Sequence, residues 1–407
     1  MLIRFEVSNF RSIRHPVELS MVAIDEDRPE ARRVPNLGAS LVPVAAIYGP
    51  NASGKSNVLA ALGWLREAVR DSLRFWDDGI PLQPFAFAEG DNKSSEFTIE
   101  SVIDGVRFEY VVELDAKAVH YEGLFHYPEK KRRRIFEREG TGFNLQRGLG
   151  SLSGTRELLT ERTLALSIAR RFDEPLVLGF TQDLLGGQTL GDHVVGGRWS
   201  RRYGFETRDW LTSQQAMQES DEALALLRMA DLGIDGVAID KQVDTDGVSP
   251  LERFRLRLIH RTSDGRVPLD FAFESEGTRT WFALIGPVLT ALKTGRLVIF
   301  DELDASLHPT LSTQLIRLFH DPTTNPLGAQ LIFSSHDTSL LNHLNRDEVW
   351  LTEKLEGGAT RLGALAEFAG ERVRKSQNLE KAYLHGRFGA LPDVDRTEML
   401  RALGLIG

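Results

Sequence analysis

The chain has 407 residues and no cysteine, and its 49 Lys and Arg residues face 58 Asp and Glu residues. This length is enough for roughly two or three domains. The composition, 42% apolar and 26% charged, is that of a globular protein and excludes wholesale disorder. Disulfides, thiolate nucleophiles and cysteine-based metal sites are excluded as well. With neither a signal peptide pattern nor an apolar run of about 18 residues, we expect a cytoplasmic protein that makes no membrane contact.

The chain begins with strand patterns. Residues 2–7 and 17–19 have strand character, and the polar stretch 25–40, which contains proline and glycine, predicts a loop. Residues 44–48 form a short, continuous apolar run. Such a run is typical of a strand that is buried on both faces of a sheet.

A helix and an antiparallel sheet are predicted next. Apolar residues recur at three- and four-residue steps over 58–76, which predicts a helix. Between about 95 and 138 the period falls to two, which predicts an antiparallel meander. The expected strands are 97–100, 106–111, 119–121 and 134–137.

The middle of the chain has a mostly helical pattern, with glycine-rich breaks at 185–187 and 196–197. We expect residues 151–235 to form a helical insert that stays outside the parallel sheet and contributes nothing to the functional site. The predicted domains are therefore a first lobe at 1–150, this insert, and a second lobe at 236–407.

In the second lobe, strand patterns alternate with helical ones. The expected elements are strands at 254–260 and 268–273, a helix at 278–292, a strand at 297–300, a helix at 310–319, a strand at 330–334 and a third helix. This alternation predicts a parallel sheet. The expected fold class is α/β, with a mixed sheet, an antiparallel β lobe and the helical insert.

Residues 49–56, GPNASGKS, fit the pattern G-x-x-x-x-G-K-[ST] between a predicted strand and a predicted helix, as a phosphate-binding loop requires. Glycines let backbone N–H groups close around phosphate oxygens, and the helix N-terminus favours anions. We expect Lys55 to reach the β- and γ-phosphates of ATP and to act in catalysis, and Ser56 to bind Mg²⁺. The expected nucleotide-binding residues here are Gly49, Pro50, Asn51, Ala52, Ser53, Gly54, Lys55, Ser56 and Asn57.

Two later strands end in residues that suit the same chemistry. Strand 297–300 is followed by two carboxylates, of which Asp301 is expected to hold Mg²⁺ and Glu302 to activate the attacking water. Strand 330–334 is followed by His336, which can donate a hydrogen bond to the γ-phosphate. The three motifs together predict a P-loop ATPase.

The order of these motifs resembles the ABC-type ATPase heads of the RecF/SMC/OLD class. The opening residues Asn9–Ile13 resemble the strand and turn of that class, which implies that Arg11 contacts the nucleotide. Ser275-Glu276-Gly277 stands where the signature motif belongs, which implies that Ser275 and Gly277 contact a nucleotide held by a second molecule.

Two further segments extend the resemblance. Asp304–His308 resembles the D-loop, with His308 in place of the usual aspartate. Tyr383–Pro392 resembles the small AAA-type ATPases of abortive-infection systems, the AbiL/RloA-like group. Gln83 is a candidate Mg²⁺ ligand at the Q-loop position. An equally good interpretation is that Gln83 is an ordinary polar residue in a proline-rich turn.

The resemblance implies a Mg²⁺-dependent ATPase whose two heads close around two ATP molecules and open after hydrolysis. It also implies the ATPase component of a bacterial anti-phage defence system. Because the chain has no room for the C-terminal nuclease of full-length OLD proteins after its histidine motif, we expect a separate, nuclease-like effector. Two alternatives stay open: a RecF-like DNA-repair ATPase, and a scaffold that binds ATP with little turnover, against which Glu302 argues.

Two basic segments are candidates for nucleic-acid contact. The run 130–134, KKRRR, is flanked by Glu129 and Glu137, so a solvated, charge-compensated turn is the favoured interpretation. Arg198–Tyr203 combines cations with aromatic rings as single-strand binders do, and the start of a packed helix explains it equally well.

Overall fold

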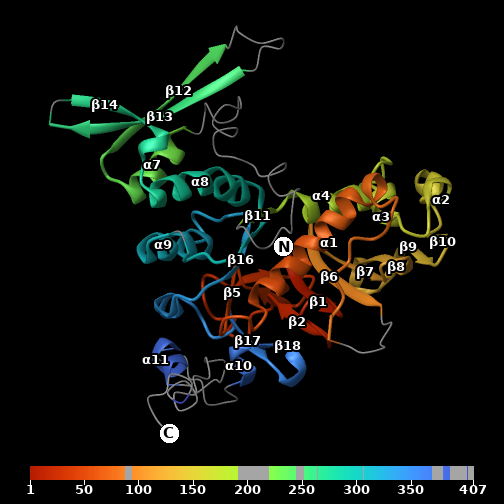
Figure 1. The fold of residues 1–407 in the computed structure, drawn as a ribbon. Coiled ribbons are helices and arrows are strands. Elements are labelled where there is room, and N and C mark those ends of the chain that lie inside the picture. The colour runs from red at the N-terminus through yellow and green to blue at the C-terminus, as the bar shows by residue number, and fades with distance from the viewer. Residues whose placement is uncertain are drawn as a thin grey trace.

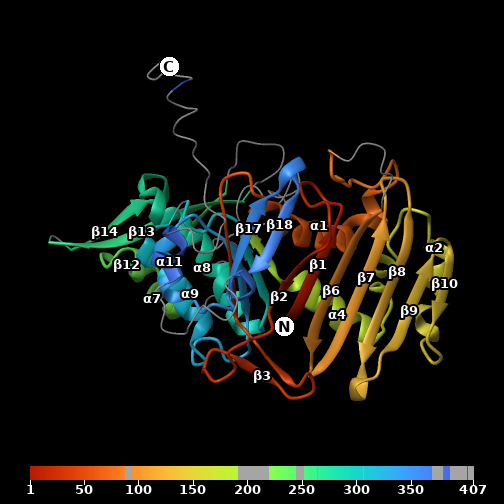
Figure 2. The same cartoon turned by 90° about the horizontal axis from the view of Figure 1, so that it is seen from below.

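The structure is a computed structural model that describes residues 1–87, 94–190, 220–243, 252–263, 265–305, 307–368, 379–385 and 401. Within these ranges, a seven-stranded antiparallel sheet and a six-stranded, mostly parallel sheet lie on either side of one long helix, α1 (Lys55–Phe75) (Figures 1 and 2). A three-stranded sheet projects from the second half of the chain (Figure 1). This arrangement confirms the predicted mixed α/β class with an antiparallel β lobe.

The antiparallel sheet has the strand order β10-β9-β8-β7-β6-β1-β2 among the described residues. Its strands are β1 (Leu2–Ser8), β2 (Val17–Ser20), β6 (Ser95–Ile103), β7 (Val106–Leu114), β8 (Val119–Tyr127), β9 (Arg133–Glu139) and β10 (Gly142–Leu145). The predicted meander is confirmed. The two N-terminal strands extend this meander, because β1 pairs with β6.

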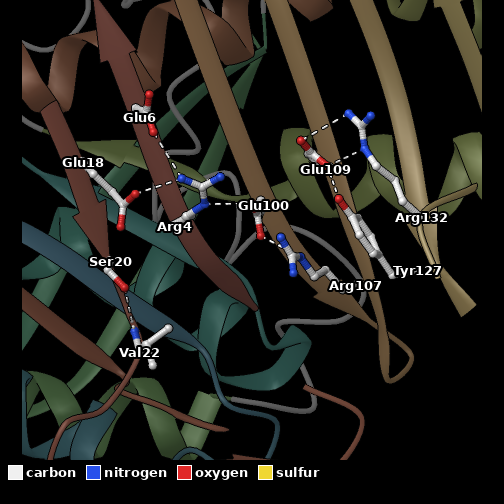
Figure 3. Close-up of polar contacts among 10 residues, drawn as sticks. All are labelled: Arg4, Glu6, Glu18, Ser20, Val22, Glu100, Arg107, Glu109, Tyr127 and Arg132. Atoms are coloured by element: carbon white, nitrogen blue, oxygen red, sulfur yellow. Dashed lines mark hydrogen bonds and ion pairs between the residues drawn. The ribbon is translucent and has the colours of Figure 1, made fainter. Parts of the chain in front are cut away.

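The two faces of this sheet differ in polarity. The inner face packs its apolar side chains against α1 and its neighbours, and it includes Ile99, Tyr110, Leu124 and Phe136. The outer face carries ion pairs that run across the strands (Figure 3). There the carboxylate of Glu100 lies 2.7 Å from both Arg4 and Arg107, and Glu109 pairs with Arg132 at 3.1 Å.

The basic run 130–134 lies at the end of the connection between β8 and β9 and includes the first two residues of β9. Its arginines have carboxylate partners, since Arg133 lies 3.9 Å from Glu129 and Arg134 lies 3.0 Å from Glu137. These pairs support the charge-compensated turn over a nucleic-acid contact. The second basic candidate, 198–203, lies outside the described residues.

The central sheet has the strand order β11-β15-β16-β5-β17-β18. Its strands are β5 (Val44–Tyr48), β11 (Gln188–Leu190), β15 (Leu297–Phe300), β16 (Gln330–Ser334), β17 (Val349–Lys354) and β18 (Thr360–Ala364). All neighbours pair in parallel except β17 and β18. The predicted strands at 44–48, 297–300 and 330–334 are confirmed.

The four inner strands of this sheet, β15, β16, β5 and β17, each contribute to two apolar cores. In β5, Ala45 and Ile47 face the core around α1, whereas Val44, Ala46 and Tyr48 face the core around α8 (Glu276–Thr294) and α9 (Pro309–His320). Because successive side chains of a strand point to opposite faces, a strand between two cores needs apolar residues at every position. This explains the continuous apolar runs in the sequence.

The segment 151–235 departs from prediction. Its helical character is confirmed in α2 (Thr155–Leu158), α3 (Ala165–Ala169), α4 (Pro175–Gly186) and α7 (Ser220–Ala230). The prediction that it stays outside the parallel sheet is wrong, because β11 pairs in parallel with β15. Helices α3 and α4 also pack in the core around α1, since their apolar residues cover the inner face of the antiparallel sheet. The boundaries at 150 and 235 stay predictions.

Several other elements differ from prediction. The expected loop 25–40 contains a hairpin of β3 (Arg32–Val34) and β4 (Ala39–Leu41). The expected third helix is only a short 3₁₀ helix, η4 (Thr338–His343), and the two strands β17 and β18 follow it. The remaining 3₁₀ helices are η1 (Pro128–Lys130), η2 (Gly150–Gly154), η3 (Phe271–Phe273) and η5 (Glu356–Gly358).

The projecting sheet consists of β12 (Ile234–Val243), β13 (Glu252–Thr262) and β14 (Gly265–Asp270). Helix α7, which precedes β12, packs against α8: the Leu226 carbonyl accepts a 2.6 Å hydrogen bond from the Trp281 indole. After β18 come α10 (Leu365–Phe368) and α11 (Leu379–Leu384). Of the Tyr383–Pro392 motif, residues 386–392 lie outside the described residues. None of the described helices is long and apolar enough to cross a membrane.

One fully buried polar network stabilises the first lobe. The carboxylate of Glu122 accepts hydrogen bonds from the backbone N–H groups of Ala165 and Leu166 at 2.6 and 2.8 Å, and from the Tyr110 hydroxyl at 2.9 Å. The guanidinium of Arg138 lies 3.8 Å away, and neither charged side chain is exposed. The network fixes the start of α3 to the antiparallel sheet.

Candidate functional site

The loop between β5 and α1 adopts a backbone that requires glycine at two positions. Gly49 has φ 151° and Gly54 has φ 104°. A Cβ atom on Gly54 would lie 2.0 Å from the Thr360 hydroxyl, and one on Gly49 would lie 2.3 Å from the Thr352 hydroxyl. Both the backbone conformation and the lack of space therefore exclude larger residues.

Hydroxyl groups brace this loop from behind. The Ser53 and Thr352 hydroxyls lie 2.6 Å apart, and the Thr360 hydroxyl donates to the Ser53 carbonyl at 2.9 Å. The Ser12 hydroxyl lies 2.7 Å from the Thr360 hydroxyl and accepts a hydrogen bond from the side-chain amide of Asn57 at 2.6 Å. Sequence reasoning missed both threonines, because it did not predict the strands that carry them.

Lys55 is the first residue of α1 and is only 6% exposed. Its ammonium donates hydrogen bonds to the carbonyls of Gly49 and Pro50 at 2.9 and 3.2 Å. Burial lowers the pKa of Lys55, and the negative charges of Asp301 and Glu302 oppose this shift. The loop thus folds around a cation whose charge is only partly balanced.

Asp301 follows β15 and is 3% exposed. Its Oδ1 atom accepts hydrogen bonds from the Ser56 hydroxyl at 3.0 Å and from the Ser334 hydroxyl at 2.5 Å. Its Oδ2 atom is buried and accepts no hydrogen bond from any described residue. Hydroxyl and carboxylate oxygens are ligands that Mg²⁺ prefers, and Mg²⁺ commonly uses one or two carboxylates together with phosphates. The unpaired oxygen beside Ser56 therefore fits a Mg²⁺ site.

Glu302 has a left-handed backbone, with φ 55°, which is strained for a residue other than glycine. Its N–H group donates to the Ser334 hydroxyl at 2.8 Å, and its carbonyl accepts from Ala305 at 3.0 Å. Ser334 thus contacts both carboxylate residues, one through the side chain and one through the backbone. Sequence reasoning assigned no role to Ser334, although it belongs to the segment that carries His336.

A cleft of about 850 Å³ lies in front of these groups. Its lining brings together the phosphate loop, Glu302 and His336, as the sequence predicts; the lining residues are Asn51, Ala52, Gly54, Lys55, Ser56, Asn57, Glu302, Asp304, Ala305 and His336. The Asp304 carboxylate accepts from the backbone N–H of His336 at 3.0 Å, so the two segments are joined at the cleft. Of the predicted D-loop, Ser306 lies outside the described residues.

Arg11 and Gln83 do not line this cleft. They bind each other, with the Arg11 Nε atom 2.8 Å from the Gln83 Oε1 atom and a backbone hydrogen bond of 2.7 Å. Both line a second hollow of about 290 Å³ beside α1. Burial lowers the pKa of Arg11, while the charge of Asp301 opposes the shift. The structure therefore does not bring Gln83 together with Ser56.

Ser275 and Gly277 also lie outside the cleft lining. The Ser275 hydroxyl caps α8 by accepting from the backbone N–H of Thr278 at 3.1 Å. Among the described residues, nothing lies within 4 Å of a Cβ atom built on Gly277, so the space beside it is open. His308, which replaces the usual aspartate, caps α9 by accepting from Thr310 at 3.3 Å.

Comparison with solved structures identifies Smc heads. The chain is 14% identical to an Smc head bound to the C-winged helix domain of ScpA, with a TM-score of 0.45, and the match covers 90% of this chain and 98% of that one. For an Smc head from Pyrococcus furiosus with an extended coiled coil, bound to the C-terminal domain of ScpA, the values are 12%, 0.42, 90% and 97%. For an Smc head from Pyrococcus yayanosii with a coiled coil and joint, they are 11%, 0.44, 94% and 99%.

None of the curated proteins compared with the chain matches it. A family model described as "AAA domain, putative AbiEii toxin, Type IV TA system" matches residues 44–342. The match covers most of the chain and includes the phosphate loop, both carboxylates and His336. The expected resemblance to AAA-type ATPases of abortive-infection systems is thereby confirmed, and the chain belongs to this AAA-domain family.

Proposed function

We propose that the protein hydrolyses the γ-phosphate of ATP with Mg²⁺. One observation carries this proposal: Lys55, Ser56, Glu302 and His336 line a single cleft, and the unpaired oxygen of Asp301 lies beside Ser56. Most buried side-chain polar atoms have a hydrogen-bond partner, and a bound ion is one explanation for a buried oxygen that has none. A cleft lined by the phosphate loop, with a bare carboxylate oxygen on a residue bonded to Ser56 of its lining, suits a phosphate–metal site.

Each residue then has a distinct role. Backbone N–H groups of the loop and the Lys55 ammonium would bind the phosphates, with Lys55 exchanging its two carbonyl partners for phosphate oxygens. Ser56 and Asp301 would hold Mg²⁺, which neutralises charge on the β- and γ-phosphates. Glu302 would accept the proton of the attacking water, and His336 would donate a hydrogen bond to the γ-phosphate. Contacts of Arg11 with the nucleotide and of Gln83 with Mg²⁺ stay predictions.

Two variants separate binding from turnover. Lys55→Ala should abolish tight ATP binding and hydrolysis, because the phosphate charge loses its main partner. Glu302→Gln should bind ATP like the wild type and lower kcat by roughly 10²-fold or more, the size of a lost general base. Glu129→Gln, an exposed carboxylate on the β8–β9 connection, is the matched control. Wild-type turnover by Glu302→Gln would refute the assignment.

We further propose that two chains complete the site as a homodimer. Ser275 and Gly277 stand at the N-terminus of a 19-residue helix, outside the chain's own cleft and beside open space, which suits contact with a γ-phosphate held by a second copy. Ser275→Arg should bind ATP as a monomer and hydrolyse it poorly. Mixing it with Lys55→Ala should restore one working site per heterodimer. Full hydrolysis by Ser275→Arg at concentrations without detectable dimer would contradict this model.

We propose that the ATPase serves bacterial anti-phage defence in the cytoplasm and acts with a separate, nuclease-like effector. The family description, which names a putative toxin of a toxin–antitoxin system, supports this role. The test is to identify what copurifies with Glu302→Gln in ATP, since this variant should accumulate the closed dimer. A nuclease-like chain supports the defence role, whereas DNA that stimulates wild-type turnover favours repair. Binding without measurable turnover by the wild type favours a scaffold.

A further inference from the structure

A buried arginine of the phosphate-loop helix holds the edge strand of the central sheet. Arg66, about three turns after Lys55 on α1, donates to the Leu184 carbonyl at 2.8 Å, to the Thr189 hydroxyl at 2.7 Å and to the Gly187 carbonyl. The three acceptors lie in the last turn of α4, at its C-cap and in β11. One planar guanidinium therefore fixes the whole connection between these two elements.

The burial of this cation is costly. Arg66 is 3% exposed, and burial lowers its pKa to about 10. Among the described residues, no carboxylate lies within ion-pair distance of it, although Glu67 and Asp183 act on it from further away. A buried charge with neutral partners destabilises a fold relative to an apolar side chain of similar size.

The strand that Arg66 holds is bonded to the candidate metal ligand. Thr189 and Leu190 pair with Ile299 and Phe300 of β15, and the next N–H group along, that of Asp301, donates to the Leu190 carbonyl at 3.1 Å. Asp301 is thus held by Leu190 at its backbone and by two hydroxyls at its side chain. Removal of Leu190 would leave this backbone N–H without an acceptor.

Strand β11 approaches β15 closely at Gly187. A Cβ atom on Gly187 would lie 2.5 Å from the Leu297 carbonyl, although the φ of Gly187, −68°, is open to any residue. Space, and not backbone conformation, therefore requires glycine here. The glycine-rich break in the sequence corresponds to a tight junction between β11 and β15, the strand that Asp301 follows.

We propose that Arg66 is a positioning residue for Asp301: by holding β11 through Thr189 and Gly187, it fixes the strand that bonds the backbone of the Mg²⁺-binding carboxylate. This inference rests on the proposed function for its effect on the metal, but the link between Arg66 and the Asp301 backbone is independent of it. Groups that orient metal ligands commonly change metal affinity by about 10- to 100-fold when they are removed.

The first test measures hydrogen exchange of the Asp301 amide in the nucleotide-free protein. Thr189→Val keeps the side-chain shape and removes one acceptor of Arg66, and Arg66→Lys removes the planar fork. Thr181→Val is the control, because the Thr181 hydroxyl is buried, more deeply than the half-buried Thr189, but bonds only to carbonyls within α4. Exchange should be about tenfold faster in the first two variants and unchanged in the control.

The second test measures metal affinity. Mn²⁺ binding to the nucleotide-bound protein, followed by electron paramagnetic resonance, should weaken about tenfold in Thr189→Val and Arg66→Lys. Nucleotide binding in the presence of a chelator should not change, and kcat should fall more than KM for ATP rises. A structural role alone would lower stability without separating metal binding from nucleotide binding.

The outcomes distinguish the two proposals. Unchanged exchange of the Asp301 amide in both Thr189→Val and Arg66→Lys would overturn the positioning role, whatever the activity. If the wild type binds Mn²⁺, faster exchange in the two variants together with an unchanged Mn²⁺ affinity would overturn the positioning role as well. A wild type that neither binds Mn²⁺ nor hydrolyses ATP would remove the proposed function, and the exchange comparison would still decide whether Arg66 holds Asp301.

Discussion

Ser334→Ala should damage both stability and catalysis, because one hydroxyl serves both carboxylate residues. The Ser334 hydroxyl donates to Asp301 at 2.5 Å and accepts from the Glu302 N–H at 2.8 Å. A hydrogen bond to a charged group is worth about 1.5–3 kcal/mol, and an N–H group left without an acceptor costs about 1 kcal/mol more when it is partly buried. We therefore expect Ser334→Ala to lower the free energy of unfolding by about 2–4 kcal/mol.

The measurement is urea unfolding of the nucleotide-free protein, together with the steady-state ATPase rate. Ser312→Ala is the matched control, since the Ser312 hydroxyl is fully buried but has no hydrogen-bond partner among the described residues. Removal of that hydroxyl should cost nothing measurable. For Ser334→Ala, kcat should also fall by about tenfold or more, because Glu302 loses a contact that holds its strained backbone. Equal stability of the two variants would refute this account of Ser334.

Three further predictions address other parts of the molecule. Glu122→Gln should lower the free energy of unfolding by about 3–5 kcal/mol, because it leaves the buried Arg138 guanidinium without its carboxylate. Arg134→Gln, at an exposed ion pair, should lower it by less than about 1 kcal/mol. Urea unfolding of the two variants makes the comparison. Burial lowers the pKa of Lys55, and bound phosphates would raise it again. ATP affinity should therefore fall as the pH rises through the alkaline range, and ATP binding in that range should take up a proton. Calorimetry in two buffers of different ionisation enthalpy measures this proton uptake. Gly54→Ala should abolish nucleotide binding, because its Cβ atom would clash with β18, whereas Gly277→Ala, beside open space, should leave the nucleotide-free protein as stable as the wild type.

The sequence predicted the parts of the fold whose signal is local. Strand 44–48 and helix α1 carry their own periodicity, and the phosphate loop between them has a fixed pattern of residues. Strand β11 has only three residues, Gln188–Leu190, and forms because β15 and Arg66 supply its partners. No local pattern specifies such a strand, so its place in the sheet could not be predicted.

The candidate site was predictable to a similar degree. Lys55, Glu302 and His336 belong to motifs and line one cleft. Ser334 and the two threonines behind the loop are ordinary strand residues, and their importance depends on which side chains the fold brings next to them. Gln83 illustrates the opposite case, because its place in the sequence suits a metal ligand while its side chain bonds to Arg11.

The hydroxyl brace behind the phosphate loop has a consequence for synthesis of the protein. Ser53 is held by Thr352 and Thr360, and β5 lies between β16 and β17, so the loop depends on strands that are translated about 300 residues after it. A nascent chain that has only reached α9 contains every residue of the loop but lacks Thr352 and Thr360. Contacts this distant in sequence also form late in folding. We therefore expect the loop to reach its final shape only after β17 and β18 have left the ribosome, and a product that ends before β17 to lack this brace.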